Sequence, residues 1–214
     1  MRARSPAEGS GPGFAQADPL AAQTDCMRWE LAAPEQPLSD GAVTLRVPAV
    51  EDEAAIDVHV RRAGGLDQGW LQLSTASPSN RGRWIVQDWL NGWARLSSHN
   101  GPALVLTVVG APELVGMLGL GMLKPDVVEV VYGVAPEWRG RGLATRAARL
   151  VAEWLVCDRS VREVELRIGP GHVESQRVAA GAGFALVGAV QHVVERSGEI
   201  CEDLRFVYAS ARST

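Results

Sequence analysis

Residues 127–144 read VVEVVYGVAPEWRGRGLA, an apolar run followed by a glycine-rich segment. The run 127–134 is almost continuously apolar and β-branched, which is typical of a central strand covered on both faces. Beyond the glycines, apolar residues recur at the spacing of an amphipathic helix: Leu143, Ala147, Leu150, Val151, Trp154 and Leu155. The stretch therefore predicts a strand, a tight loop and a helix that begins near Gly142.

The loop between this strand and this helix has the composition of an anion-binding site. Gly140 and Gly142 allow a ligand to approach the main chain closely. Arg139 and Arg141 add positive charge, and a helix N-terminus presents unpaired N–H groups to an anion. Ala144, just inside the helix, keeps the surface low. From these residues alone, the loop is a phosphate or pyrophosphate site, a solvated turn or an RNA contact, since neither the P-loop nor the dinucleotide pattern is complete.

The segments on either side of this loop predict a mixed α/β sheet. Three β-branched runs separated by turn residues predict an antiparallel meander: Leu104–Val109, Leu114–Leu123 and Val127–Val134. Before the meander we expect a strand over Val43–Val47 and helices over Glu51–Ala63 and about Trp84–Trp93. After the long helix we expect a strand over Val164–Ile168, a helix over Val173–Ala182, a strand over Phe184–Val190 and a last strand within Leu204–Ala209. The predicted order is a meander followed by β-α-β-α-β units.

Composition limits the classes of protein to which the chain can belong. Residues 1–37 are rich in glycine, proline and alanine, so we expect a disordered or loosely docked arm before one domain over 38–214. No apolar run approaches the ~18 residues that span a bilayer, and the N-terminus lacks a signal-peptide pattern, so we expect a cytoplasmic protein without membrane contact. The net charge of −4 disfavours nucleic acid as a partner. We expect a monomer or a homodimer, and no cluster of His, Cys or acidic residues predicts a metal.

Three motifs in order resemble the GNAT superfamily of N-acetyltransferases. Arg139-x-x-Gly142-x-Ala144 matches its Arg/Gln-x-x-Gly-x-Gly/Ala signature, and residues 129–136 resemble the strand that leads into that loop. Residues 172–184 resemble the second motif, Asn-x-x-Ser followed by a helix and Gly-Phe, with His172 in the place of the asparagine. The stretches 195–199 and 203–208 look like the branch that resembles ribosomal-protein N-terminal acetyltransferases.

This resemblance implies a splayed central sheet and acetyl-CoA as cosubstrate. It implies that Arg139, Gly140, Arg141, Gly142, Leu143 and Ala144 hold the pyrophosphate of CoA. It implies that the pantetheine arm and the thioester meet Tyr132, Gly133, Val134, His172 and Ser175. Glu129 becomes the candidate general base and Ser175 the candidate acid for the thiolate. The residues themselves leave two alternatives open: Glu129 on a solvated strand face and Ser175 as a helix cap.

The predicted reaction moves an acetyl group from acetyl-CoA to a primary amine by direct attack through a tetrahedral intermediate. The acceptor is a protein N-terminus or a small-molecule amine, and residues 51–96, which contain several acidic side chains, are expected to form most of its wall. One alternative is a non-catalytic acyl-CoA-binding or regulatory module. An RNA-binding domain is disfavoured by the net charge and by the absence of an aromatic stacking motif.

Overall fold

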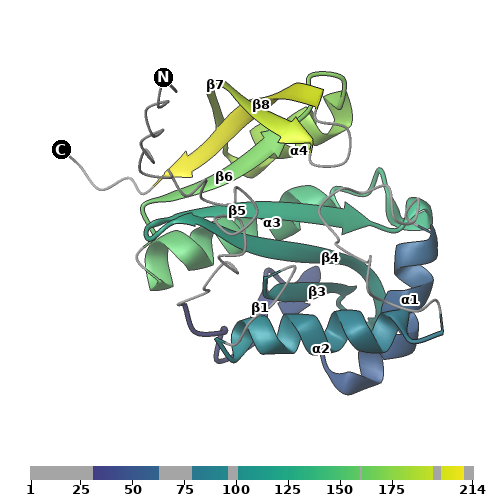
Figure 1. Cartoon of the computed structure of the whole chain (residues 1–214). Helices are drawn as coiled ribbons and strands as arrows, with labels where there is room; N and C mark the ends of the chain where they lie inside the picture. Colours follow the sequence, from purple (N-terminus) through teal and green to yellow (C-terminus); the bar gives the residue numbers. More distant parts are fainter. Residues whose placement is uncertain (1–30, 63–78, 96–100, 160, 195–198, 210–214) are drawn as a thin grey trace, which may run out of the picture.

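The computed structural model describes residues 31–62, 79–95, 101–159, 161–194 and 199–209. Its strands and helices follow the predicted order along the chain (Figure 1). They are β1 (Leu38–Ser39), β2 (Val43–Arg46), α1 (Glu53–Arg62), α2 (Arg81–Trp93), β3 (Ala103–Val108), β4 (Ala111–Lys124), β5 (Val127–Val134), α3 (Leu143–Asp158), β6 (Glu163–Ile168), α4 (Val173–Ala182), β7 (Ala185–Val194) and β8 (Glu199–Ala209). Short 3-10 turns precede α1 (Val50–Asp52) and α3 (Pro136–Trp138).

All the strands lie in one sheet, in the order β1-β2-β3-β4-β5-β6-β8-β7. The predicted meander is confirmed, because β3, β4 and β5 pair antiparallel in sequence order. The pair β5–β6 is parallel, which makes the sheet mixed as expected. The position of the last strand in the sheet was not predicted: β8 inserts between β6 and β7, pairing antiparallel with both.

Several predicted boundaries were wrong by a few residues. The strand expected over Leu114–Leu123 begins three residues earlier, at Ala111. The helix expected from about Trp84 begins three residues earlier, at Arg81. The two-residue strand β1 was missed, because a strand that short leaves no periodic pattern. Residues 1–30 of the predicted arm lie outside the described residues.

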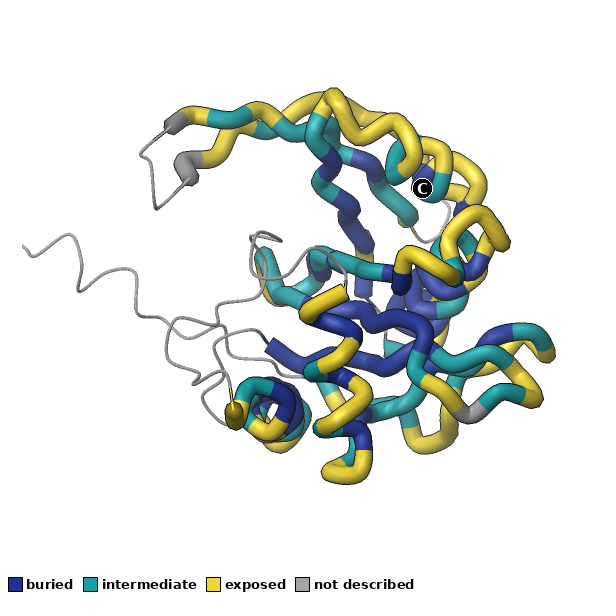
Figure 2. The backbone as a smooth tube through the Cα atoms, turned by 90° about the vertical axis from the view of Figure 1, so that its right-hand side faces the viewer, coloured by how far each residue is buried: buried dark blue, intermediate teal, exposed yellow. Residues whose placement is uncertain are grey.

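Helices cover both faces of the sheet, and each face has its own apolar core. On one face α1 and α2 pack Ile56, Ile85 and Trp89 against Val105 and Met117. On the other face α3 and α4 bury a larger cluster that includes Leu104, Leu118, Val128, Val151 and Ala179. Side chains alternate between the two faces along each strand, so one pair of helices contacts the odd-numbered or even-numbered residues of a strand and the other pair contacts the rest. Figure 2 shows the result: the middle strands are buried, whereas β7 and β8 are mostly exposed or half-buried.

The sheet opens between β5 and β6. These strands share only the pairs Val127↔Glu163, Val128↔Val164 and Glu129↔Glu165, although β5 continues to Val134 and β6 to Ile168. Beyond Glu129, β5 is paired on its β4 side alone within the described residues. The splayed sheet expected from the resemblance is therefore present.

Candidate active site

The glycine-rich loop has the backbone conformation that its sequence predicted. Gly140 and Gly142 both have φ of +73°, in the left-handed region that side chains disfavour. A Cβ on either glycine would meet nothing within 4 Å, so the backbone conformation, rather than crowding, requires glycine there. The first helical bond of α3 runs from Arg146 N to Gly142 O at 3.1 Å. The amides of 143–145 consequently stand free of intrahelical partners at the positive end of the helix.

The two loop arginines are anchored within the loop. Arg139 donates from Nε to the Val134 carbonyl at 3.0 Å, and Arg141 donates from Nη2 to the Glu137 carbonyl at 3.1 Å. The Arg141 guanidinium also lies 4.7 Å from the ring centre of Trp138. Both residues remain exposed, so they contribute positive charge at the mouth of the loop while they stabilise its shape.

An ion pair joins this loop to α1. Arg62 Nη1 lies 2.8 Å from Glu137 Oε1, across a sequence separation of 75 residues. His59, one turn earlier on α1, is only 4% exposed, and its Nδ1 has no hydrogen-bond partner among the described residues. Burial lowers the pKa of His59 to about 4, while Glu137 opposes the shift and Arg139 adds to it. The proximity of His59 to the loop was not predicted from the sequence.

The open edge of β5 presents two residues of the predicted pantetheine site. Ala135 N donates to Val115 O of β4 at 2.9 Å. Because peptide groups alternate along a strand, those of Tyr132 and Val134 point away from β4, into the opening. Gly133 points the other way, since a Cβ on Gly116 of β4 would lie 2.5 Å from the Gly133 carbonyl oxygen. The Val134 carbonyl is already bonded to Arg139, which leaves its N–H as the group available at this position.

Of the remaining loop residues, Leu143 and Ala144 differ in exposure. The Leu143 side chain is 8% exposed and belongs to the core, so only its backbone can reach a ligand. Ala144 is half-buried and packs against the same core. A small, half-buried side chain at Ala144 is consistent with the expectation that nothing bulky projects at the start of α3.

Tyr132 and the start of α4 meet on the α3–α4 face of the opening. The Tyr132 hydroxyl donates to the Ser175 carbonyl at 3.4 Å, and burial raises the pKa of this phenol. Ser175 is the third residue of α4 and half-buried, whereas His172 stands at the N-cap without a side-chain capping bond. Ser175 is thus inside the first turn rather than at the cap position.

Glu129 lies on the opposite face, at the point where the sheet opens. It is the last β5 residue paired with β6, and its side chain is 25% exposed. Alternation places it on the face shared with Met117, which is the α1–α2 face. Burial raises the pKa of Glu129, with Glu165 and Asp203 adding to the rise and Arg167 and His192 opposing it.

A charged network around Glu129 was missed from the sequence. Arg167 Nε lies 3.9 Å from Glu129 Oε1 and 3.5 Å from Glu165 Oε2. Arg205 donates from Nε to Glu165 Oε1 at 2.8 Å, and His192 Nδ1 lies 3.4 Å from Asp203 Oδ2. The signal was present as the alternation of charged and apolar residues over 163–168, EVELRI, which gives β6 one charged face. Which residues share that face across strands depends on register, and no local pattern reports it.

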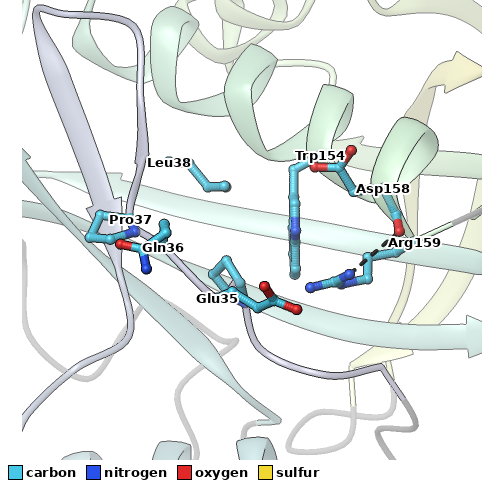
Figure 3. A pocket seen from close by; sticks show the side chains of 8 residues that line it. Glu35, Gln36, Pro37, Leu38, Trp154, Asp158 and Arg159 are labelled. Atoms are coloured by element: carbon cyan, nitrogen blue, oxygen red, sulfur yellow. Dashed lines mark hydrogen bonds between the residues drawn. The ribbon is translucent and has the colours of Figure 1, made fainter.

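A separate cavity lies at the far end of α3. It has a volume of about 340 Å³ and is lined by residues 34–38 together with Trp154, Asp158 and Arg159 (Figure 3). Arg159 spans it by donating to the Ala33 carbonyl at 3.1 Å and lying 5.3 Å from the Trp154 ring centre. At about 1.5 Å of rise per residue, the length of α3 separates this cavity from the glycine loop. The cavity is distinct from the candidate active site.

Two further properties concern the described residues alone. They contain no group of three or more His, Cys, Asp or Glu side chains arranged to hold a metal ion. None of their helices combines the length and apolar character needed to cross a membrane.

The fold and sequence of the chain match known acetyltransferases. The family model of the acetyltransferase (GNAT) domain matches residues 42–185. Among solved structures, the ribosomal-protein-S5-alanine acetyltransferase from Vibrio fischeri has a TM-score of 0.65 at 14% identity, over 84% of this chain and 100% of that one. RimJ from Mycobacterium smegmatis, in complex with CoA-disulfide, has a TM-score of 0.65 at 20% identity, over 82% and 86%. An acetyltransferase of the GNAT family from Bacillus anthracis has a TM-score of 0.65 at 13% identity, over 81% and 98%.

No curated protein sequence matches the chain. At these identities the solved structures establish a shared fold, and the family match covers more than half of the sequence. A sheet that opens after Glu129 and a glycine loop that leads into α3 are the structural counterparts of the matched motifs. The chain belongs to the acetyltransferase (GNAT) domain family and is an N-acetyltransferase.

Proposed function

We propose that the chain transfers the acetyl group of acetyl-CoA to a primary amine, with Glu129 as the general base. The observation that carries this proposal is the place of Glu129, a mostly buried carboxyl with a raised pKa at the point where β5 and β6 part. A carboxyl with a raised pKa accepts a proton more readily near neutral pH. Its position on the α1–α2 face puts it opposite Tyr132 and Ser175, so the acceptor and the leaving thiol occupy different sides of the opening.

The residues of the loop fit the pyrophosphate of CoA. Two glycines with positive φ, free space above them and unpaired amides at the start of α3 form a cradle for an anion. Arg139 and Arg141 supply charge, and the Tyr132 peptide group at the open edge is available to the pantetheine amides, which leaves the Val134 N–H for the thioester carbonyl. When bound, acetyl-CoA supplies an acetyl group activated as a thioester.

The chain's own residues account for both proton transfers. Glu129 takes a proton from the acceptor's ammonium group, directly or through water, and so frees the nitrogen lone pair. The C–N bond forms first, and the Val134 N–H stabilises the negative charge that develops on the carbonyl oxygen of the tetrahedral intermediate. The C–S bond then breaks. Ser175 gives a proton to the departing thiolate, and the second proton that the nitrogen loses as the amide forms is returned to Ser175 through solvent. The sum converts an ammonium ion and a thioester into an amide, a thiol and one proton, which Glu129 releases to solvent.

The charge near Glu129 supports a cationic acceptor. Glu129, Glu165 and Asp203 lie near one another, while Arg167, Arg205 and His192 neutralise them in part. A protonated amine is attracted to such a site. Helices α1 and α2, which lie within the predicted acceptor wall, share this face of the sheet; residues 63–78 and 96 of that wall lie outside the described residues.

The test is thiol release from acetyl-CoA against a panel of small amines and of peptides with different N-termini, with calorimetric titration of CoA alongside. We expect CoA binding and turnover on at least one primary amine, with N-acetylated product confirmed by mass spectrometry. CoA binding without turnover on any amine would support the non-catalytic module. A folded protein that binds no CoA would overturn the proposal altogether.

A further inference from the structure

Arg167 is placed between two carboxylates that face each other across the start of the opening. Glu129 and Glu165 are Cα partners, and Arg167 follows Glu165 by two residues on the same face of β6. Its Nε lies 3.9 Å from Glu129 Oε1 and 3.5 Å from Glu165 Oε2. This Nε meets the geometry of a hydrogen bond with neither carboxylate, so it is an ion-pair partner of both and lies closer to Glu165.

Glu165 is held from its other side. Its side chain is 5% exposed, and Arg205 donates to Oε1 from Nε at 2.8 Å. The same Arg205 donates from Nη2 to Glu163 at 2.7 Å, which fixes the guanidinium between two acidic side chains of β6. Burial opposes ionisation of Glu165, but Arg205 and Arg167 outweigh it and lower the pKa of this carboxyl. Glu165 is therefore a permanent negative charge that competes with Glu129 for Arg167.

We propose that Arg167 is a positioning residue for Glu129: it holds the Glu129 carboxylate at the opening of the sheet, and Glu165 limits how strongly it does so. This inference rests on the proposed role of Glu129 as the base. A base bonded tightly to an arginine would be a poor proton acceptor, and one with no cation nearby would stay protonated. An arginine shared between two carboxylates should give Glu129 a proton affinity between these two extremes.

The other charges that face Glu129 lie on β7 and β8. Asp203 on β8 favours the protonated form of Glu129, and His192 on β7 opposes this effect. These two side chains are paired with each other at 3.4 Å, so their influence on Glu129 is partly cancelled. Arg167 and Glu165 remain as the two groups whose removal should shift Glu129 in opposite directions.

The experiment compares R167M and E165Q, with R167K as the matched control that keeps the charge. The readouts are the acid limb of kcat/KM against pH and the titration midpoint of the Glu129 carboxyl, followed by carbon NMR and assigned with E129Q. We expect R167M to raise the pKa of the acid limb and the titration midpoint of Glu129 by about one pH unit each, because a neighbouring cation is lost. E165Q should lower both, because a neighbouring anion is lost and Arg167 becomes free to pair with Glu129. R167K should stay close to the wild type.

The NMR titration keeps the two proposals distinguishable. If the wild type shows no turnover, the proposed function fails, but the titration still tests whether Arg167 and Glu165 control Glu129. If the wild type turns over amines and the two variants shift Glu129 in the same direction, or leave it unmoved, the Arg167 inference is overturned. Thermal melting and CoA affinity serve as folding controls. If E165Q does not fold, the comparison of R167M with R167K alone tests the inference. An arginine with only a structural role would leave the titration midpoint of Glu129 unchanged in R167M.

Discussion

Arg139 donates a 3.0 Å hydrogen bond from Nε to the carbonyl of Val134, the last residue of β5. This bond ties the middle of the glycine loop back to the strand that leads into it. It leaves the Val134 N–H facing the opening and fixes the distance between the two parts of the predicted CoA site. The loop is thus shaped before any ligand arrives, which reduces the ordering cost of binding.

Replacing Arg139 with methionine should weaken CoA binding by about tenfold or more, because a charge and the Val134 bond are lost together. Calorimetric titration of CoA measures this directly. The matched control is R83M, in which an exposed arginine of α2 is removed from a weak ion pair with Glu53. CoA affinity that falls equally in both variants would show that only overall charge matters.

Replacing Gly142 with alanine should destabilise the fold by about 1 kcal/mol and also weaken CoA binding, because φ is +73° there. G110A is the matched control, since Gly110 has φ of +85° in a turn and likewise has nothing near its Cβ position. Both variants should lose similar stability in urea unfolding. Only G142A should lose CoA affinity, and equal CoA affinity in the two would remove the loop from the cofactor site.

Replacing Glu129 with glutamine should lower kcat by about a hundredfold or more while CoA affinity stays nearly unchanged, because a general base acts on the acceptor amine. Steady-state kinetics and calorimetry together measure the two effects. E113Q, at an exposed position of β4, is the control. Wild-type kcat in E129Q would exclude Glu129 from the mechanism.

Stability should fall as the pH drops from about 6.5 to about 4, because the pKa of the buried His59 is about 4 in the folded protein. In the unfolded chain an ordinary histidine takes up its proton near 6.5, so the unfolded state binds more protons throughout this window. By pH 5 this effect should lower the free energy of unfolding by about 2 kcal/mol, and the loss should be absent in H59L. Urea unfolding of both proteins at pH 7.5 and pH 5 provides the measurement, and an equal pH dependence in both would contradict it.

The parts of this protein that its sequence predicts are those encoded locally. The apolar run 127–134 and the glycines at 140 and 142 specify a strand and a left-handed loop within a few residues. The insertion of β8 between β6 and β7 and the meeting of Glu129 with Arg167 arise from pairing between distant segments. Nothing in the local pattern fixes that pairing, because strand order and register are set by the whole sheet. His59 belongs to the same class, since the loop it faces lies far along the chain.

The roles of the predicted site residues stay predictions, but their placement separates them. Tyr132, Val134 and Ser175 gather on or beside the opening, and Glu129 lies across the sheet from them. Leu143 has its side chain in the core. A motif predicts that residues belong to a site, whereas only the pleat of the strand tells which face each one serves.

Because β5 separates from β6 after Glu129, the first part of β5 is an interior strand and the rest of it is an edge strand. Exposed strand edges normally invite pairing with another polypeptide, and proteins blunt them with charge, bulges or cover. Here the unpaired edge lies in a wedge between β5 and β6, two strands of the same sheet, rather than at the outer edge of the sheet. A single narrow chain with amide groups can still enter and complete the missing ladder. Occupancy of that wedge should therefore protect the β5 amides from hydrogen exchange more than any other strand of the molecule.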